Sequence, residues 1–315
     1  MSRISIVICS RNRAASLART LAAIGKVALP AGAACEVLVV DNGSTDNTAT
    51  AVSGCHLENA IPVRYLNEPI QGLARARNSG IAVAGGDIIV FTDDDVVPAK
   101  DWLTGLCAPI LAGQAEAVAG GVRLALHLVR PWMNAHHRAW LAGTDELDAR
   151  NPSQMVGANM AFARRVLQRV PAFDPELGSG AIGFGEDTLF SLQLREAGYR
   201  IAGAFEASVE HHFREERLRR SSWISAARNM GRTDAYLAYH WENSVWPRQW
   251  RVVFAAWARR AACSMLELAA RWKSSVVTER LLNATRHLHA HLQYLRESKR
   301  PRNYARHGLV KLALA

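Results

Sequence analysis

The chain has 315 residues, of which 49% are hydrophobic, enough for one large domain with an extension or for two domains. Its formal net charge of +10 is uneven, because residues 1–210 carry 18 basic and 21 acidic side chains whereas residues 211–315 carry 20 and 7. The basic last third indicates an anionic partner, a membrane surface or a polyanion.

The cysteines and the lengths of the apolar runs indicate the cellular compartment. The five cysteines are odd in number, and no two have the spacing of a zinc or redox pair, so we expect a reduced, cytoplasmic environment. The apolar run Ile4 to Cys9 is too short for a signal peptide. No stretch approaches the roughly 18 unbroken apolar residues of a transmembrane helix. We expect a cytoplasmic protein whose basic third attaches it peripherally to the inner face of the cell membrane.

Strands and helices alternate at the start of the chain. Residues 4–9 and 36–41 have the apolar runs of buried strands, and a helix between them ends at Gly25. This alternation predicts a parallel sheet. The first strand is followed by Ser10-Arg11-Asn12-Arg13, which lacks the glycines of a dinucleotide-binding turn, and the chain has no Walker A loop. A bound nucleotide would therefore be held by side chains.

Three carboxylates, Asp93, Asp94 and Asp95, follow the apolar strand that ends at Phe91. Like charges this close raise each other's pKa unless a cation lies among them. Mg²⁺ or Mn²⁺ suits carboxylate oxygens, and ligands gather at the carboxyl ends of strands in open α/β sheets. An acidic turn before the next helix is the alternative. On the preceding helical stretch, Arg75 and Arg77 point to different faces, so one of them could reach a phosphate.

In their order along the chain, these motifs resemble a family 2 glycosyltransferase over roughly residues 3–215. The motifs are Ile6 to Arg13, Val39 to Asp46, Gly72 to Gly80 and Phe91 to Asp95. The resemblance implies the α/β GT-A fold of nucleotide-diphospho-sugar transferases, with a Rossmann-like, mixed, mostly parallel sheet. It implies a catalytic domain at 1–215, followed by a basic, amphipathic helical extension at 216–315.

The resemblance also implies roles for individual residues. The nucleotide would be held by residues near the strand ends: Ser10, Arg11, Asn12, Asp41, Arg77, Asp93 and Asp94. Asp93 and Asp95 would bind the metal, Mg²⁺ or Mn²⁺, within a DxD-type motif that bridges metal and diphosphate.

Further along the chain, Asn159 interrupts an apolar strand and resembles the wall beside the donor sugar, although a backbone partner would also satisfy its amide. The aromatic and basic residues at 127–152 form a lid or an acceptor surface, or they are ordinary packing.

Gly185, Glu186 and Asp187 precede a helix, where carboxylates are favourable without any function. By resemblance, Asp187 is the catalytic base, and Gly185 and Glu186 lie near donor and acceptor. His212 is expected to contact metal or diphosphate, with His211 close behind. Alternation along the strand places only one of these two histidines in the site.

The last third changes character. Helical periodicity returns near Trp223, and an amphipathic pattern runs from Trp246 through Arg259 and Arg260 to Trp272. Tryptophans beside a basic face suit a membrane interface, whereas a helical hairpin packed on the catalytic domain is the alternative.

Taken together, the sequence predicts an inverting, metal-dependent glycosyltransferase of cell-surface glycan or polysaccharide biosynthesis. The donor would be a nucleotide-sugar and the acceptor hydroxyl would belong to a glycan, a lipid-linked saccharide or a protein; no nucleic-acid partner is expected. The alternatives are a nucleotidyltransferase of related fold, which would need a glycine-rich basic loop after the first strand, and a non-catalytic nucleotide-sugar-binding protein.

Overall fold

The computed structural model describes residues 2–246, 250–270 and 277–312, and it divides the chain into two compact units. The first unit comprises Met1–Glu176 and Glu186–Phe213, and the second comprises Leu177–Gly185 and Arg214–Ala315. The sequence predicts a boundary at 215/216, with residues 177–185 in the catalytic domain. The structure groups that loop with the helices instead, and each unit is described by itself.

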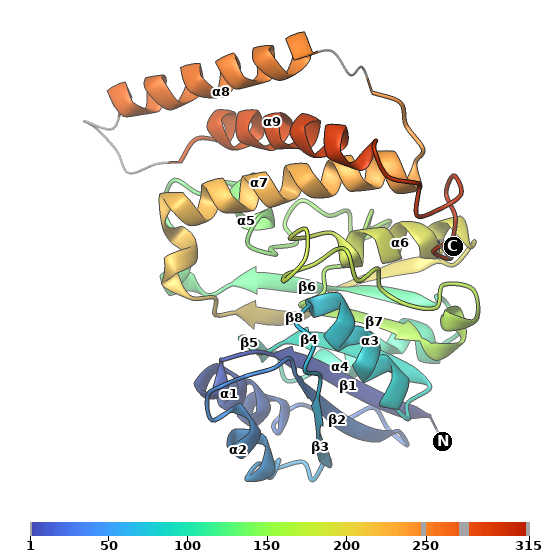
Figure 1. Ribbon diagram of the computed structural model, residues 1–315. Helices are drawn as coiled ribbons and strands as arrows, with labels where there is room; N and C mark the ends of the chain where they lie inside the picture. The colour runs from blue at the N-terminus through green and yellow to red at the C-terminus, as the bar shows by residue number, and fades with distance from the viewer. Residues whose placement is uncertain (1, 247–249, 271–276, 313–315) are drawn as a thin grey trace. The chain divides into compact units, whose positions relative to one another are not determined.

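The first unit is built on an eight-stranded mixed sheet of order β3-β2-β1-β4-β7-β6-β8-β5 (Figure 1). Four pairs are parallel (β1–β2, β2–β3, β1–β4, β6–β8), and β7 and β5 are antiparallel to their neighbours. The strands are β1 Arg3–Ser10, β2 Ala34–Asp41, β3 Val63–Asn67, β4 Ile88–Asp93, β5 Val96–Pro98, β6 Ala117–Leu124, β7 Asn159–Ala163 and β8 Ile201–His211.

Helices flank this sheet, and its central strands are buried. In β1 the residues from Ile4 to Ile8 are all buried, as expected for a parallel strand covered on both faces. The helix α3 packs closely on β1, because a Cβ added at Gly80 would lie 2.5 Å from Val7. The helical elements are α1 Ala14–Ile24, α2 Thr48–Ser53, α3 Leu73–Val83, α4 Trp102–Leu111, η1 Leu126–Leu128, α5 Ala135–Ala139, η2 Arg164–Gln168 and α6 Glu186–Glu196.

The second unit is helical. Figure 1 shows α8 beside α9 and α9 beside α7, and both pairs are in contact. Its elements are η3 Glu215–Leu218, α7 Arg220–Tyr236, the π-helical turn η4 Leu237–Trp241, α8 Trp250–Ala270 and α9 Glu279–Glu297. Of the amphipathic pattern predicted from Trp246 to Trp272, residues 247–249 and 271–272 lie outside the described residues. None of the helices in the described ranges is long and apolar enough to cross a membrane.

The loop 177–185 packs on α7 through its glycines. The hydroxyl of Thr233 donates a hydrogen bond to the Phe184 carbonyl at 2.8 Å. Gly183 and Gly185 both have positive φ, and a side chain at either would collide with Asn229 or Thr233 of α7. Only glycine fits this close approach, which explains why the loop belongs to the helical unit.

Candidate active site

The carboxyl ends of the first four strands bring polar side chains to one edge of the sheet. In the parallel registers, Ser10 of β1 pairs with Asp41 of β2, Cys9 with Asp93 of β4, and Asp41 with Asn67 of β3. Because parallel strands end together, residues far apart in the chain meet here. Ser10, Asp41 and Asp93, which the sequence predicts to hold nucleotide or metal, lie at this edge.

The Asp94 carboxylate is buried and held at this edge by two partners. The Ser10 hydroxyl donates to its Oδ2 at 2.6 Å, and the Arg13 guanidinium lies 2.9 Å from its Oδ1. Burial raises the pKa of Asp94 to about 6, against the lowering effect of Arg13. Asp94 therefore acts as an anchor for the turn.

Arg13 is a cation within the acidic triplet that the sequence analysis did not select. Its Nη1 contacts Asp94 and also Asp95 Oδ2, at 2.6 Å. Burial lowers the pKa of Arg13, but the adjacent Asp94 and Asp95 carboxylates raise it by more, so the guanidinium stays charged. Arg13 could have been found from the sequence, because three adjacent carboxylates are expected to need a positive charge among them.

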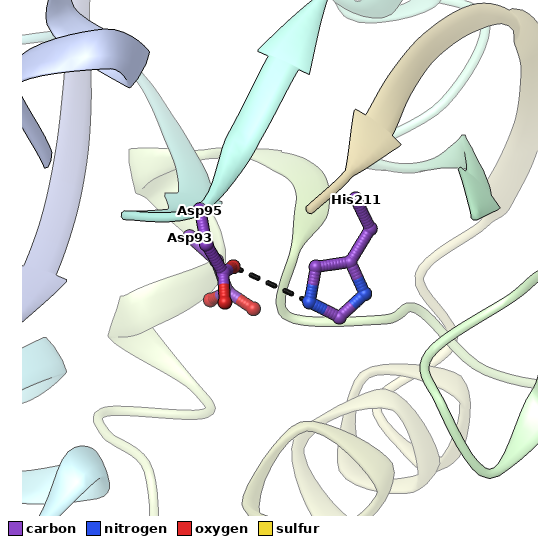
Figure 2. Close-up of side chains that lie close together, drawn as sticks. All are labelled: Asp93, Asp95 and His211. Carbon is purple, nitrogen blue, oxygen red and sulfur yellow. Dashed lines mark ion pairs between the residues drawn. The ribbon is translucent and has the colours of Figure 1, made fainter. Parts of the chain in front are cut away.

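Asp93, Asp95 and His211 converge (Figure 2), with one ligand atom from each lying within 4.8 Å of the others. His211 Nε2 lies 3.3 Å from Asp95 Oδ1. His211 Nδ1 lies 2.9 Å from the Leu141 carbonyl, which can accept its proton and leave Nε2 with a lone pair toward the carboxylates. Burial and the neighbouring Asp95 raise the pKa of Asp93. Two carboxylate oxygens and one imidazole nitrogen fit a divalent cation such as Mn²⁺.

His212 is not at this cluster. The resemblance favours it over His211, but its Nε2 lies 2.7 Å from Glu210 of β8. The buried His211 takes the place beside Asp95, because Val96 of β5 pairs with His211 and aligns the two. We therefore correct the candidate ligand from His212 to His211.

The Asp41 carboxylate organises the loop after β2. Its Oδ1 accepts from the backbone N–H of Ser44 at 2.8 Å, and its Oδ2 accepts from the Tyr65 hydroxyl at 2.7 Å. Asn12, in the left-handed region with φ 54°, accepts from the backbone N–H of Thr45 at 2.7 Å. Ser10, Asn12 and Asp41 thus form one connected edge, and Arg11 is exposed beside them.

Arg77 and Glu186 form a buried ion pair at 2.6 Å that links α3 to α6. Burial raises the pKa of Glu186, the adjacent Asp187 adds to this, and Arg77 opposes it. The Arg77 guanidinium also faces the Phe91 and Phe173 rings at 5.6 and 5.5 Å. The sequence predicts that Arg77 binds the nucleotide, but its guanidinium pairs with the Glu186 carboxylate instead. Arg75 is exposed.

Asp187 lies in the first turn of α6 and is partly exposed. Its Oδ2 accepts from the backbone N–H of Gly157 at 2.9 Å, and its Oδ1 accepts from the N–H of Thr188 at 2.8 Å. These two hydrogen bonds fix the orientation of the Asp187 carboxylate. Glu186 is the preceding residue in the chain. Gly185, the residue before Glu186, groups with the helical unit.

The Asn159 amide is fully satisfied inside the first unit. It accepts from Trp102 Nε1 and donates to the carbonyls of Gly121 and Ala207, each at 2.8 Å. Its side chain is 0% exposed, so it cannot hydrogen-bond a sugar without losing these partners. The backbone alternative left open by the sequence is the one observed, and Asn159 joins α4, β6 and β8 to β7.

The segment 127–152 contributes directly to the site. The Leu141 carbonyl orients His211, and the Arg138 side chain pairs with Asp145 at 3.0 Å. The His137 backbone N–H donates to Asn134 at 3.1 Å. The segment thus touches the Asp93–Asp95–His211 cluster through the Leu141 carbonyl, and its choice between lid, acceptor surface and packing stays a prediction.

Comparisons with known proteins identify the family. The profile of Glycosyl transferase family 2 matches residues 5–170, and the chain belongs to this family. Over 244 residues it is 28% identical to the pre-mycofactocin glycosyltransferase of Mycobacterium tuberculosis, covering 75% of this chain and 47% of that protein. It is 26% identical to the glycosyltransferase AglE of Haloferax volcanii, with 64% of each chain covered. The chain therefore spans about half to two thirds of these relatives.

Solved structures show the fold. The mannosyltransferase PcManGT from Pyrobaculum calidifontis, in complex with GDP-Man and Mn²⁺, aligns with a TM-score of 0.65 and 20% identity, covering 93% of this chain and 87% of that one. GalNAc-T7 with UDP, GalNAc and Mn²⁺ aligns with a TM-score of 0.57 and 17% identity, covering 84% and 51%. The predicted GT-A fold with a helical C-terminal region is confirmed.

Proposed function

We propose that the protein transfers a sugar from a nucleotide-sugar donor to an acceptor hydroxyl, with inversion at the anomeric carbon and with Mg²⁺ or Mn²⁺ as cofactor. The observation that carries the proposal is the convergence of Asp93, Asp95 and His211 at the carboxyl ends of β4 and β8. This cluster lies at the same edge as Ser10 and Asp41, which would hold the nucleoside.

The residues divide the chemistry between them. A divalent cation at the cluster would neutralise the charge that develops on the departing nucleoside diphosphate. Asp187 would accept the proton from the acceptor hydroxyl as that oxygen attacks the anomeric carbon. The N–H of Gly157 holds one Asp187 oxygen, and the Arg77–Glu186 pair fixes the start of α6. One displacement assisted by one base inverts the anomeric centre.

Two other functions are less well supported. A nucleotidyltransferase would use a glycine-rich basic loop after the first strand, where this chain has Ser10, Arg11 and Asn12. A non-catalytic nucleotide-sugar-binding protein would have no use for Asp187 beyond helix capping. The convergence of Asp93, Asp95 and His211, together with a carboxylate at Asp187, supports transfer over these two functions.

The donor and acceptor classes are also proposals. Neighbours of the same fold bind GDP-Man, UDP-GlcNAc and UDP, which supports a nucleoside diphosphate-sugar here. A glycan, a lipid-linked saccharide or a protein would supply the hydroxyl in cell-surface glycan or polysaccharide biosynthesis.

The helical unit would hold the enzyme peripherally at an anionic membrane surface, at the inner face of the cell membrane. Residues 211–315 carry 20 basic against 7 acidic side chains, and α8 exposes Phe254, Trp257, Met265 and Leu266. Apolar side chains on a helix within a strongly basic unit suit an anionic interface.

The deciding experiment is a panel of nucleotide-sugars tested with Mn²⁺, with Mg²⁺ and with EDTA. A donor that binds the native protein raises the melting temperature, and the one that does so with metal is then tested for hydrolysis or transfer. The product anomer, read by NMR, should be opposite to that of the donor. Release of inorganic pyrophosphate from a nucleoside triphosphate and a sugar phosphate would instead establish a nucleotidyltransferase.

A further inference from the structure

Two histidines of α9, His287 and His291, face each other in the helical unit. They are four residues apart, so their side chains lie on the same side of the helix, one turn apart. His287 is exposed and His291 is half-buried. Their Nε2 atoms are 3.2 Å apart, whereas their ring centroids are 4.6 Å apart. The two rings therefore converge through their Nε2 atoms.

This separation of the Nε2 atoms is close to that of two ligands on one metal ion. Zn–N bonds to histidine are about 2.0–2.1 Å long, so two imidazole nitrogens at the tetrahedral angle are about 3.3–3.4 Å apart. With bonds of similar length at a right angle, as on an octahedral or square-planar ion, they are about 2.8–3.0 Å apart. The observed 3.2 Å lies between these values, so one ion fits within bonding distance of both nitrogens. A weak hydrogen bond between two neutral imidazoles is the alternative, and the experiments separate the two.

The His291 ring is held by aromatic neighbours. The Trp246 ring packs against it with 5.3 Å between centroids and stacks on Tyr294 at 4.8 Å. The Tyr294 hydroxyl accepts from the Trp246 N–H at 3.0 Å and donates to the Ser244 carbonyl at 2.9 Å. Burial and the adjacent His287 lower the pKa of His291, which keeps its imidazole neutral, the form that binds a metal. One ligand is thus positioned in advance, and the exposed His287 completes the pair.

The pair offers different ligand atoms from the Asp93–Asp95–His211 cluster. Within the described ranges, that cluster is the only group that brings three ligand atoms within 4.8 Å of one another, so no third described side chain joins the two histidines. Imidazole nitrogens suit Zn²⁺, Ni²⁺ and Cu²⁺, whereas carboxylate oxygens suit Mg²⁺ and Mn²⁺. Water would fill the other coordination positions of an ion held by two histidines, so we expect the ion to exchange with solvent.

We propose that His287 and His291 form a second metal site, which binds one Zn²⁺, Ni²⁺ or Cu²⁺ ion through their Nε2 atoms. The site lies in the helical unit, goes beyond the proposed sugar transfer and does not depend on it. The ion would link two successive turns of α9 beside Trp246, whose N–H and ring attach residues 244–246 to this helix. Bound metal should therefore stabilise α9 and the attached segment.

The first test is calorimetric titration of Ni²⁺ into the full chain at about pH 7.5, where an imidazole of ordinary pKa is neutral. Asp95→Asn is the background, because this change removes a ligand from the metal cluster of the first unit. We expect one ion bound per chain. The same event should occur in the wild-type protein, so its absence is distinct from a failure of the proposed catalytic metal site.

Two ligand variants and one matched control locate the ion. His287→Gln and His291→Gln each remove a nitrogen donor, and each should weaken Ni²⁺ binding at least about tenfold, since loss of even an outer-shell partner costs that much. His289→Gln is the control, because His289 is two residues from each ligand and lies on another side of α9. The control should bind Ni²⁺ as the background does. Unchanged affinity in both ligand variants would overturn the proposal and place the ion elsewhere, for example between His127 and His212, whose ring centroids are 5.6 Å apart.

Electron paramagnetic resonance with substoichiometric Cu²⁺ identifies the ligand atoms directly. Of these divalent ions Cu²⁺ binds most tightly, so it fills the strongest nitrogen site first. We expect coupling to two imidazole nitrogens, which His291→Gln reduces to one and His289→Gln leaves unchanged. Coupling to one nitrogen or to none in the wild-type protein contradicts the site and leaves the 3.2 Å contact as a hydrogen bond between the rings.

Hydrogen exchange measures the effect of the ion on the helix. With Ni²⁺ bound, the amides of residues 244–246 and 287–294 should exchange more slowly, because a ligand that binds the folded state suppresses local opening. The amides of α3 in the first unit are the reference and should not change in the Asp95→Asn background. Slower exchange that His287→Gln abolishes supports the stabilising role, and exchange that Ni²⁺ does not slow overturns it.

Discussion

The Arg77 guanidinium and the Glu186 carboxylate meet at 2.6 Å, with their side chains only 4% and 6% exposed. This pair ties α3, which follows β3, to the first turn of α6, which carries Asp187. The pair therefore sets the position of the proposed base relative to the edge of the sheet. The pair has a positioning role, because each charged group is neutralised by the other.

Removing one partner of this pair should destabilise the fold strongly. Arg77→Gln leaves Glu186 buried without its cation, and breaking a buried pair in this way typically costs about 3–5 kcal/mol. Denaturant unfolding of the full chain measures the change. Arg75→Gln, two residues away and exposed, is the control and should change stability by less than about 0.5 kcal/mol. Equal stabilities of the two variants would contradict the pairing.

Much of the sheet edge could be predicted from the sequence, because it depends on local patterns. Apolar runs ending in Ser10, Asp41 and Asp93 predict parallel strands whose polar ends meet, and the structure has that register. The Arg77–Glu186 pair could not be predicted in this way, because the two residues are 109 positions apart and spacing alone says only that Arg75 and Arg77 differ in face.

The choice between His211 and His212 could not be made from the sequence, because alternation along a strand says only that the two side chains take opposite faces. The pairing of β8 with β5 decides it, since Val96 pairs with His211 and His211 lies beside Asp95. This pairing is tertiary, so no feature of the His211-His212 dipeptide signals it.

The metal cluster predicts different effects for the two adjacent histidines. His211→Gln removes a nitrogen donor and should weaken Mn²⁺ binding at least about tenfold, a loss that even outer-shell partners of a metal can cause. Asp95→Asn should weaken it further, because it removes a charge. His212→Gln, whose imidazole contacts Glu210, should bind as wild type does. Titration of Mn²⁺ followed by electron paramagnetic resonance gives the three affinities, and a larger loss for His212→Gln would restore the sequence-based choice.

The stability of the helical unit should depend on pH through His289. Burial, together with Arg228, Arg232, Arg260 and Arg296, lowers its pKa to about 4 from an unfolded value near 6.5. Between these values the unfolded chain binds the proton and the folded chain does not, so stability is complete above about pH 6.5 and falls as pH decreases toward 4. Comparing melting temperatures of wild type and His289→Gln over this range isolates the effect. The same slope in both proteins would assign it to other groups.

The exposed face of α8 should govern membrane attachment. Phe254 is 61% exposed and Leu266 67% exposed, and burying one such side chain contributes about 1.5–3 kcal/mol. Phe254→Gln/Leu266→Gln should therefore reduce flotation with anionic vesicles by tenfold or more. Leu126→Gln removes an exposed leucine of the first unit and is the control. Equal recovery with neutral and anionic vesicles would exclude the electrostatic part, and no flotation with either would exclude attachment altogether.

Asp187 is the residue on which the proposed chemistry depends most directly. Asp187→Asn keeps the size of the side chain and retains an oxygen that can accept from the Gly157 N–H, as Asp187 does at 2.9 Å. The amide cannot take a proton from the acceptor hydroxyl. We expect near-normal stability and donor affinity, with turnover reduced on the order of 10²-fold or more, within the range that general bases contribute.

Glu186→Gln separates the two adjacent acids. Because Glu186 is buried against Arg77, its substitution should lower stability first and affect turnover mainly through the position of α6. Donor affinity, kcat and the denaturation midpoint, measured for both variants under the same conditions, give two distinct patterns. Wild-type turnover in Asp187→Asn with loss in a folded Glu186→Gln would move the base to Glu186. Wild-type turnover in both would mean that neither acid removes the proton, and the inverting mechanism would then need another base.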